Sequence, residues 1–124
     1  MKQALATAQA PAAIGPYSQG IAAGQTVYVS GQLPIDPATG AIPKGIAAQT
    51  AQSLKNIQAI LAEQGMTLAD VVKTTVFLAD MNDFAEMNKV YGEYFAQPFP
   101  ARSAVQVAKL PKGAPLEIEC IAVK

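Results

Sequence analysis

The sequence contains one arginine, Arg102, and no histidine, so lysines carry all the other positive charges. Arg102 follows Pro98 and Pro100, which restrict the backbone in front of it. A guanidinium held in this way can bind a carboxylate through two parallel hydrogen bonds, which a lysine cannot do. The alternative is a structural ion pair with a neighbouring acid. Because histidine is absent, acid–base chemistry must use carboxylates, hydroxyls or backbone amides.

Two glutamates are the best candidates for a general base. Glu117 and Glu119 alternate with apolar residues in a predicted strand over residues 116–123. Their side chains therefore share one face of the strand, about 6.5 to 7 Å apart. A carboxylate that is partly buried without a cation has a raised pKa and can take a proton from water. The alternative is a solvated or ion-paired glutamate at the edge of the strand.

Other polar positions could line a site. Tyr17 lies at the apex of a tight turn between Gly15 and Gly20, where its phenol could donate to a substrate oxygen or simply close the core. Ser30 and Gly31 end a predicted strand, where backbone N–H groups could bind an anion. Asn88 lies in the middle of a predicted helix, where its amide is either exposed or reaches a cleft.

The remaining reactive residue types point away from metal and thiol chemistry. Cys120 is expected to be a small buried hydrophobic residue, and a single cysteine cannot form an internal disulfide. No spacing of cysteine and histidine is typical of a metal site, and the acidic residues form no cluster. We therefore expect no metal, and a reducing, cytoplasmic location.

The elements that position these residues follow from hydrophobic periodicity. Apolar side chains at helical spacing predict helices, the first ending before Gly65 and the second capped by Asn82 or Asp83. β-Branched and alternating stretches predict strands. The predicted helices span residues 46–64 and 83–96, and the strands span residues 19–22, 26–30, 71–79, 104–109 and 116–123. The order β-β-α-β-α-β-β indicates an α+β fold, a single domain over residues 1–124, with both helices on one face of the sheet.

The second face of this sheet must also be covered. Ile121 and Val123 point away from the predicted helices, and the strand over residues 71–79 is apolar on both faces. Only 15% of the residues are charged, which is low for a soluble monomer. Two helices cannot cover both faces, so the sequence predicts a homo-oligomer.

Charge and hydropathy argue against nucleic acids and membranes as partners. The net charge is zero and no basic run is present, whereas nucleic-acid binding usually needs a basic surface. No apolar run approaches the roughly 18 residues of a membrane span. We expect neither a nucleic acid nor a membrane as partner.

Motifs along nearly the whole chain make the sequence similar to the RidA (YjgF) family of reactive-intermediate imine/enamine deaminases. These motifs are Ala12–Gln19, Ser30–Gln32, Val72–Val76, Asn82–Phe84, Phe99–Ser103 and Leu116–Glu119. The resemblance implies a fold of the chorismate mutase type. It also implies a homotrimer whose sheets close a central barrel, with ligand clefts between subunits.

The resemblance further implies an activity and residue roles. Arg102 would grip the substrate carboxylate, and Glu117 would position or activate the hydrolytic water. The implied catalytic residues are Arg102, Glu117 and Tyr17, and the implied substrate-binding residues are Ser30, Gly31, Asn88 and Arg102. The reaction would convert enamines and imines released by pyridoxal-phosphate dehydratases, such as 2-iminobutanoate and 2-iminopropanoate, into 2-oxo acids and ammonia, without a cofactor. Some members carry a cysteine where this chain has Ala104, so we do not expect a thiol to be required there.

Other functions remain open at this stage. The same cleft could bind or sense small carboxylic acids without turnover, because Arg102 would serve both purposes. RNA cleavage and translation inhibition are also attributed to parts of the family, but zero net charge and a single arginine argue against phosphate binding. A chaperone role has no specific support in the sequence.

Overall fold

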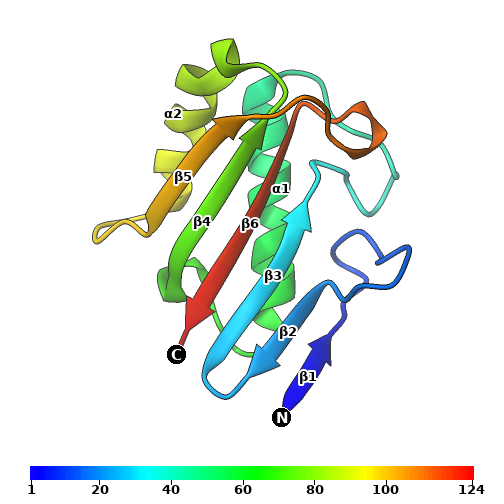
Figure 1. The fold of residues 1–124 in the computed structure, drawn as a ribbon, viewed down its shortest axis with the longest axis vertical. Coiled ribbons are helices and arrows are strands. Elements are labelled where there is room, and N and C mark those ends of the chain that lie inside the picture. The colour runs from blue at the N-terminus through cyan, green and yellow to red at the C-terminus, as the bar shows by residue number, and fades with distance from the viewer.

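The computed structural model describes residues 1–124 and contains a six-stranded sheet with two α-helices on one side (Figure 1). The sheet order is β1-β2-β3-β6-β4-β5, and only β4 and β5 run parallel. The strands are β1 Lys2–Leu5, β2 Gly20–Ala23, β3 Thr26–Gln32, β4 Val71–Leu78, β5 Ala101–Gln106 and β6 Leu116–Val123. The helices are α1 Ile46–Ala62 and α2 Phe84–Tyr94. The predicted α+β class, with both helices on one face, is confirmed.

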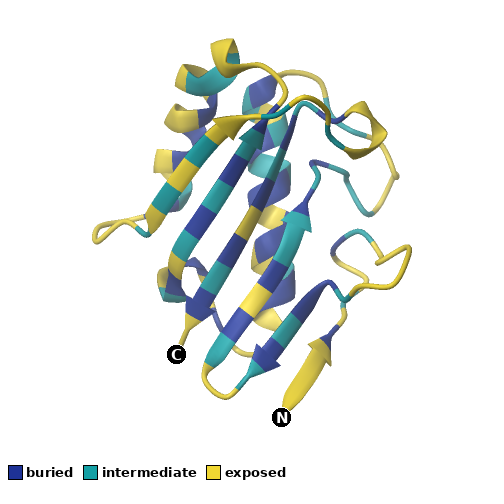
Figure 2. Cartoon of the chain, in the orientation of Figure 1, coloured by how far each residue is buried: buried dark blue, intermediate teal, exposed yellow.

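One face of the sheet packs against the helices and forms the core. In β6, Leu116, Ile118 and Ala122 are fully buried, and they alternate with partly or fully exposed residues (Figure 2). From the helix side, α1 contributes Leu54, Ile57 and other fully buried residues. The period of two in the strand and the helical spacing in α1 therefore meet in one hydrophobic cluster.

The other face of the sheet has no helix over it (Figure 1). Apolar side chains stand on it and remain accessible: Tyr28 is 50% exposed, Val105 is 42% exposed and Val123 is 40% exposed. We call this surface the open face. The sequence correctly predicted that apolar side chains would lie there, while the subunits expected to cover it stay a prediction.

Three predictions about the strands were wrong by more than one residue. The first strand, Lys2–Leu5, was not predicted at all. Its residues have little β-propensity, but it pairs with β2 from Lys2 opposite Ala23 to Leu5 opposite Gly20. Pairing and the burial of Leu5 thus outweigh local preference.

The second and third errors concern where strands begin and end. The strand predicted at residues 104–109 instead runs over Ala101–Gln106, because the backbone beside Pro100 is already extended and pairs with β4. Arg102 therefore belongs to a strand. The strand predicted to end at Ser30 continues to Gln32, with an irregularity in its pairing with β6 between Val29 and Gln32.

The helices are shorter than predicted by a few residues. α1 ends at Ala62, and α2 begins at Phe84 and ends at Tyr94. Asp83 occupies the N-cap position of α2 but makes no side-chain capping bond. Instead, Asp80 accepts a hydrogen bond from the Asn82 N–H at 2.9 Å and starts a short 3-10 turn before the helix. Neither helix combines the length and the apolar character needed to cross a bilayer.

Candidate functional site

Four of the six predicted site residues line one cavity of about 940 Å³. Its walls come from the loop between β1 and β2, the end of β3, the turn before β6, and β6 itself. The predicted residues at this cavity are Tyr17, Ser30, Gly31 and Glu117. Glu119 also lines it. We call this group the Glu117 half-site.

Gly31 and Glu117 are in close contact across adjacent strands. A Cβ atom added to Gly31 would lie 2.6 Å from Cδ of Glu117 and 2.9 Å from its Oε1. Between the pairs Val29–Cys120 and Gln32–Ile118, two residues of β3 face one residue of β6, which is the count of a β-bulge. Gly31 therefore leaves the space that the Glu117 side chain occupies.

Glu117 has the electrostatics of a general base. Its side chain is half-buried, and this burial raises the pKa of its carboxyl group. The nearby Glu119 carboxylate raises the pKa further, because two like charges disfavour each other. No cation is among the groups that shift this pKa. A carboxylate of this kind holds a proton more readily than a solvated glutamate does.

Tyr17 and Ser30 occupy the same wall of the cavity in different ways. Tyr17 is 51% exposed and its N–H donates to the Gly15 carbonyl at 2.8 Å, which closes the turn. The Ser30 hydroxyl donates to the Ser18 carbonyl at 2.6 Å. The proton of Ser30 is therefore used to fasten the turn to β3, while its oxygen can still accept a hydrogen bond.

Arg102 forms a second group together with α2. Its Nη1 donates to Asn88 Oδ1 at 2.7 Å. The guanidinium carbon lies 4.8 Å from the ring centroid of Tyr91 and 5.5 Å from that of Phe84, which are cation–π distances. No carboxylate contacts the guanidinium within ion-pair distance, so the structural ion pair left open by the sequence is not formed within this chain. Arg102 keeps N–H groups free for an acidic ligand.

The support beneath Arg102 was missed in the sequence. The Tyr91 hydroxyl and the Thr74 hydroxyl are hydrogen-bonded at 2.7 Å in the buried space between α2 and β4. Burial raises the pKa of Tyr91, so its phenol stays neutral. The available signal was Thr74, a polar residue on the buried side of a strand, and Tyr91, which lies three residues after Asn88 on the same helix face. We call Arg102, Asn88 and this support the Arg102 half-site.

The two half-sites lie on opposite faces of the same sheet. Arg102 is paired with Thr74, which is fully buried on the helix side. Glu117 is paired with Phe77 and alternates with the fully buried Leu116 and Ile118, so it stands on the open face. A single chain therefore does not bring Arg102 and Glu117 together.

Other reactive groups add little to the site. Burial raises the pKa of the Cys120 thiol to about 12, which leaves it protonated and inert, as the sequence predicted for a small buried residue. No three side chains among Cys120, the aspartates and the glutamates are close enough together to hold a metal ion.

Comparison with known proteins gives a consistent family assignment. The family model described as endoribonuclease L-PSP matches residues 7–124. A Salmonella typhimurium protein named 2-iminobutanoate/2-iminopropanoate deaminase is 51% identical over 127 residues, covering 100% of this chain and 99% of the relative. The crystal structure of the Escherichia coli YjgF gene product superimposes with a TM-score of 0.93 at 51% identity and covers 98% of each chain. That of Escherichia coli TdcF with bound serine gives a TM-score of 0.93 at 48% identity, again covering 98% of each chain.

Proposed function

This chain belongs to the RidA (YjgF) family, described as endoribonuclease L-PSP, and on that premise we propose that it hydrolyses 2-imino acids to 2-oxo acids and ammonia. The observation that carries the proposal is Glu117, a half-buried carboxylate at the wall of a cavity, with a pKa that burial and Glu119 raise and that no cation lowers. Such a group can take a proton from a water molecule. The Salmonella relative is named for this reaction, which supports the assignment.

The substrate would be held by its carboxylate. Arg102 offers a planar fork of N–H donors whose position is fixed by Asn88 and by the Tyr91 ring. TdcF, a related protein, has been crystallised with serine, a small molecule that also carries one carboxylate. A bidentate grip on the carboxylate would place the adjacent imine carbon at a defined distance from the attacking water.

Hydrolysis then needs only proton transfer. The water oxygen forms a bond to the imine carbon, and the proton it loses passes through Glu117 to the imine nitrogen. In the resulting carbinolamine, the hydroxyl proton moves through Glu117 to the nitrogen, and the carbon–nitrogen bond breaks. The nitrogen leaves as ammonia with the bonding electrons, and the oxygen becomes the keto group. Glu117 ends in its starting state, and the Tyr17 phenol can donate a hydrogen bond while charge develops on the substrate. No cofactor takes part in these steps.

A shared site explains how the two half-sites could act together. Arg102 lies on β5, which is an edge strand of the sheet. It would meet Glu117 of a neighbour if the β5 edge of one chain packs beside the open face of the next. Such an arrangement would also bury Tyr28, Val105 and Val123, which are exposed in the single chain. A closed ring with one type of interface repeated around it would create one site per interface.

The test is complementation between two inactive variants. Arg102→Ala and Glu117→Gln are each expected to remove acceleration of 2-oxo acid release when a dehydratase supplies fresh imine. When both variants are co-expressed, random assembly leaves about one site in four with both residues intact, so activity should return. Absence of recovery in mixed assemblies would refute the shared site.

The same assay separates an enzyme from a binding module. If the unmodified protein binds a small 2-oxo acid but does not speed imine hydrolysis above the uncatalysed rate, the chain binds without turnover. Arg102→Lys is the matched control, because it keeps the charge and loses the planar fork. We expect it to recover only a small part of the activity.

A further inference from the structure

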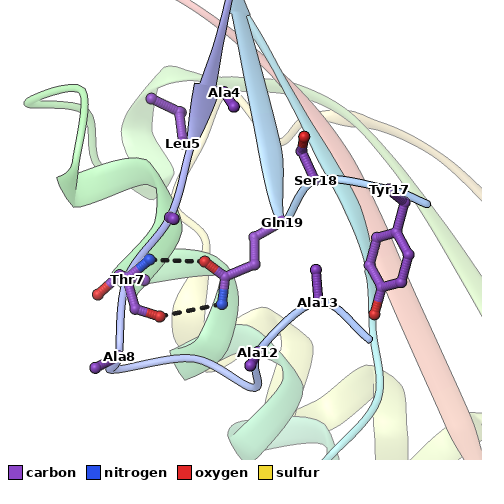
Figure 3. A pocket seen from close by; sticks show the side chains of 10 residues that line it. Ala4, Leu5, Thr7, Ala8, Ala12, Ala13, Tyr17, Ser18 and Gln19 are labelled. Atoms are coloured by element: carbon purple, nitrogen blue, oxygen red, sulfur yellow. Dashed lines mark hydrogen bonds between the residues drawn. The ribbon is translucent and has the colours of Figure 1, made fainter. Parts of the chain in front are cut away.

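Gln19 is a buried polar residue that none of the proposed chemistry uses. It precedes β2, is only 4% exposed, and points its amide into the loop between β1 and β2 (Figure 3). This loop carries Tyr17 and supplies one wall of the 940 Å³ cavity. Its alanines and prolines provide few groups that could fix its conformation.

The Gln19 amide is the main polar anchor of that loop. Its Oε1 accepts a hydrogen bond from the Thr7 N–H at 2.7 Å, and its Nε2 donates to the Thr7 carbonyl at 3.1 Å, as Figure 3 shows. The same Nε2 donates to the carbonyls of Ala10 at 3.2 Å and Pro11 at 2.7 Å. The side-chain amide thus bonds both the N–H and the carbonyl of Thr7, as the backbone of a neighbouring strand would. These two bonds lie just beyond the last backbone pair of β1 and β2, Leu5 opposite Gly20.

The orientation of the amide is fixed by its partners. Three carbonyl oxygens face the nitrogen end and one N–H faces the oxygen end, so the reversed amide would place oxygen against oxygen. Between residues 7 and 18 only one backbone–backbone hydrogen bond is formed, from Tyr17 to Gly15. The loop would therefore lose most of its polar restraints without Gln19.

Gln19 also joins the loop to the Glu117 half-site through its backbone. Its carbonyl accepts a hydrogen bond from the Ser30 N–H at 2.9 Å, and the preceding Ser18 carbonyl accepts one from the Ser30 hydroxyl. Ser30 is next to Gly31, against which the Glu117 carboxylate lies. One residue therefore contacts both the loop that carries Tyr17 and the strand end beside Glu117.

We propose that Gln19 is a positioning residue, whose buried amide holds the Tyr17 loop at the distance from Glu117 that catalysis needs. This inference rests on the proposed deaminase function for its effect on rate. Its structural content, the restraint of the loop by one amide, does not depend on turnover and can be tested separately.

Amide hydrogen exchange tests the restraint without any activity assay. In the unmodified protein, the Thr7 amide should exchange at least about tenfold more slowly than the exposed amide of Ala8, because only the former is bonded to Gln19. In Gln19→Met, which keeps the length of the side chain but removes both polar ends, this difference should disappear. Equal exchange of the two amides in the unmodified protein would overturn the proposal, whether or not the variant folds.

A double-mutant cycle tests the effect on rate. Gln19→Met should lower kcat/KM about 10- to 100-fold when Tyr17 is present. In the Tyr17→Phe background it should lower kcat/KM by less than about threefold, because a displaced loop then no longer misplaces the Tyr17 hydroxyl. Gln25→Met, the same change at an exposed position, should leave the rate unchanged. Fully additive losses would overturn the positioning role. If the unmodified protein shows no hydrolysis at all, the proposed function fails while the exchange result still decides the restraint.

Discussion

Replacing Gly31 by alanine should move the Glu117 carboxylate while leaving the fold in place. The added Cβ would lie 2.6 Å from Cδ of Glu117, and ordinary contact begins at 3.4 Å, so the carboxyl group must move by about 0.8 Å. Gly31 has no positive φ, so the backbone itself accepts alanine. The conflict is confined to one methyl group and one side chain.

The expected effects on stability and on rate differ in size. Turning Glu117 away from its preferred rotamer costs about 0.5 to 1.5 kcal/mol. Alanine offsets this by about 0.4 to 1 kcal/mol, because it restricts the unfolded chain. The free energy of unfolding should therefore change by less than about 1 kcal/mol. A displacement of this size at a reacting group can lower the rate about 10- to 100-fold, equivalent to roughly 1.4 to 2.7 kcal/mol in the barrier.

The assay measures kcat/KM for 2-oxo acid release with imine supplied by a dehydratase, together with urea unfolding. Gly92→Ala is the matched control. Gly92 lies in α2, and nothing stands within 4 Å of the position where its Cβ would be. This control should gain about 0.5 to 1 kcal/mol of stability from helix propensity and keep its full rate. The reasoning is refuted if Gly31→Ala keeps its rate within about threefold of the unmodified protein. It is equally refuted if loss of rate follows loss of folded protein.

Three further predictions concern the second half-site, the base and the open face. Tyr91→Phe leaves the buried Thr74 hydroxyl without its partner and should lower the free energy of unfolding by about 1 to 3 kcal/mol in urea titration. Adding Thr74→Val should restore stability, and a double variant as unstable as Tyr91→Phe would contradict a role for that bond. Glu119→Gln removes a like charge that raises the pKa of Glu117, so the acidic limb of the kcat/KM profile should move to lower pH, and an unmoved limb would contradict the coupling. Val105→Glu places a charge on the open face and should lower the mass of the assembly measured by light scattering. The circular dichroism spectrum should remain that of the folded chain. An unchanged mass would place Val105 outside the interface.

The Glu117 carboxyl group also ties stability to pH. Its pKa in the folded chain lies above the ordinary value of 4.5, so the folded state binds more protons than the unfolded state between 4.5 and the raised value. The contribution of this group to stability is therefore fully present below 4.5 and is lost as the pH rises through the folded pKa. Because Glu117 is only half-buried, solvent screening keeps the effect small.

Sequence patterns predicted the core elements well because burial imposes a clear period on them. The strand over Leu116–Val123 alternates without interruption, and α1 carries apolar residues at helical spacing. The strand Lys2–Leu5 could not be predicted in this way, because its stability comes from pairing with β2 and its side chains are mostly exposed. The start of β5 was missed for a related reason. The residues directly after Pro100 were not included in the predicted strand, whereas the chain is already extended there and paired with β4.

The site was predictable by residue type but not by arrangement. The lone arginine and the two glutamates of the last strand are visible in the sequence. The structure adds that the guanidinium is bonded to an uncharged amide and that Glu117 is half-buried. The hydrogen bond between Thr74 and Tyr91 and the four contacts of Gln19 join residues that are distant in sequence, so only the folded chain shows them. That Arg102 and Glu117 lie on opposite faces depends on Arg102 being part of β5, and the start of this strand was predicted three residues too late, at residue 104 instead of Ala101.

Because Arg102 and Glu117 lie on opposite faces of the sheet, they do not form an ion pair within the chain. If Arg102 and Glu117 met within one chain, they would form an ion pair, and a substrate carboxylate would have to displace Glu117. Here the guanidinium is bonded to an uncharged amide and stacked on aromatic rings, so its charge is not neutralised. Burial and the nearby Glu119 carboxylate in turn raise the pKa of Glu117, and no cation offsets these two effects. Keeping the two charges apart within the chain leaves neither of them neutralised by the other, which is what the proposed site shared between subunits requires.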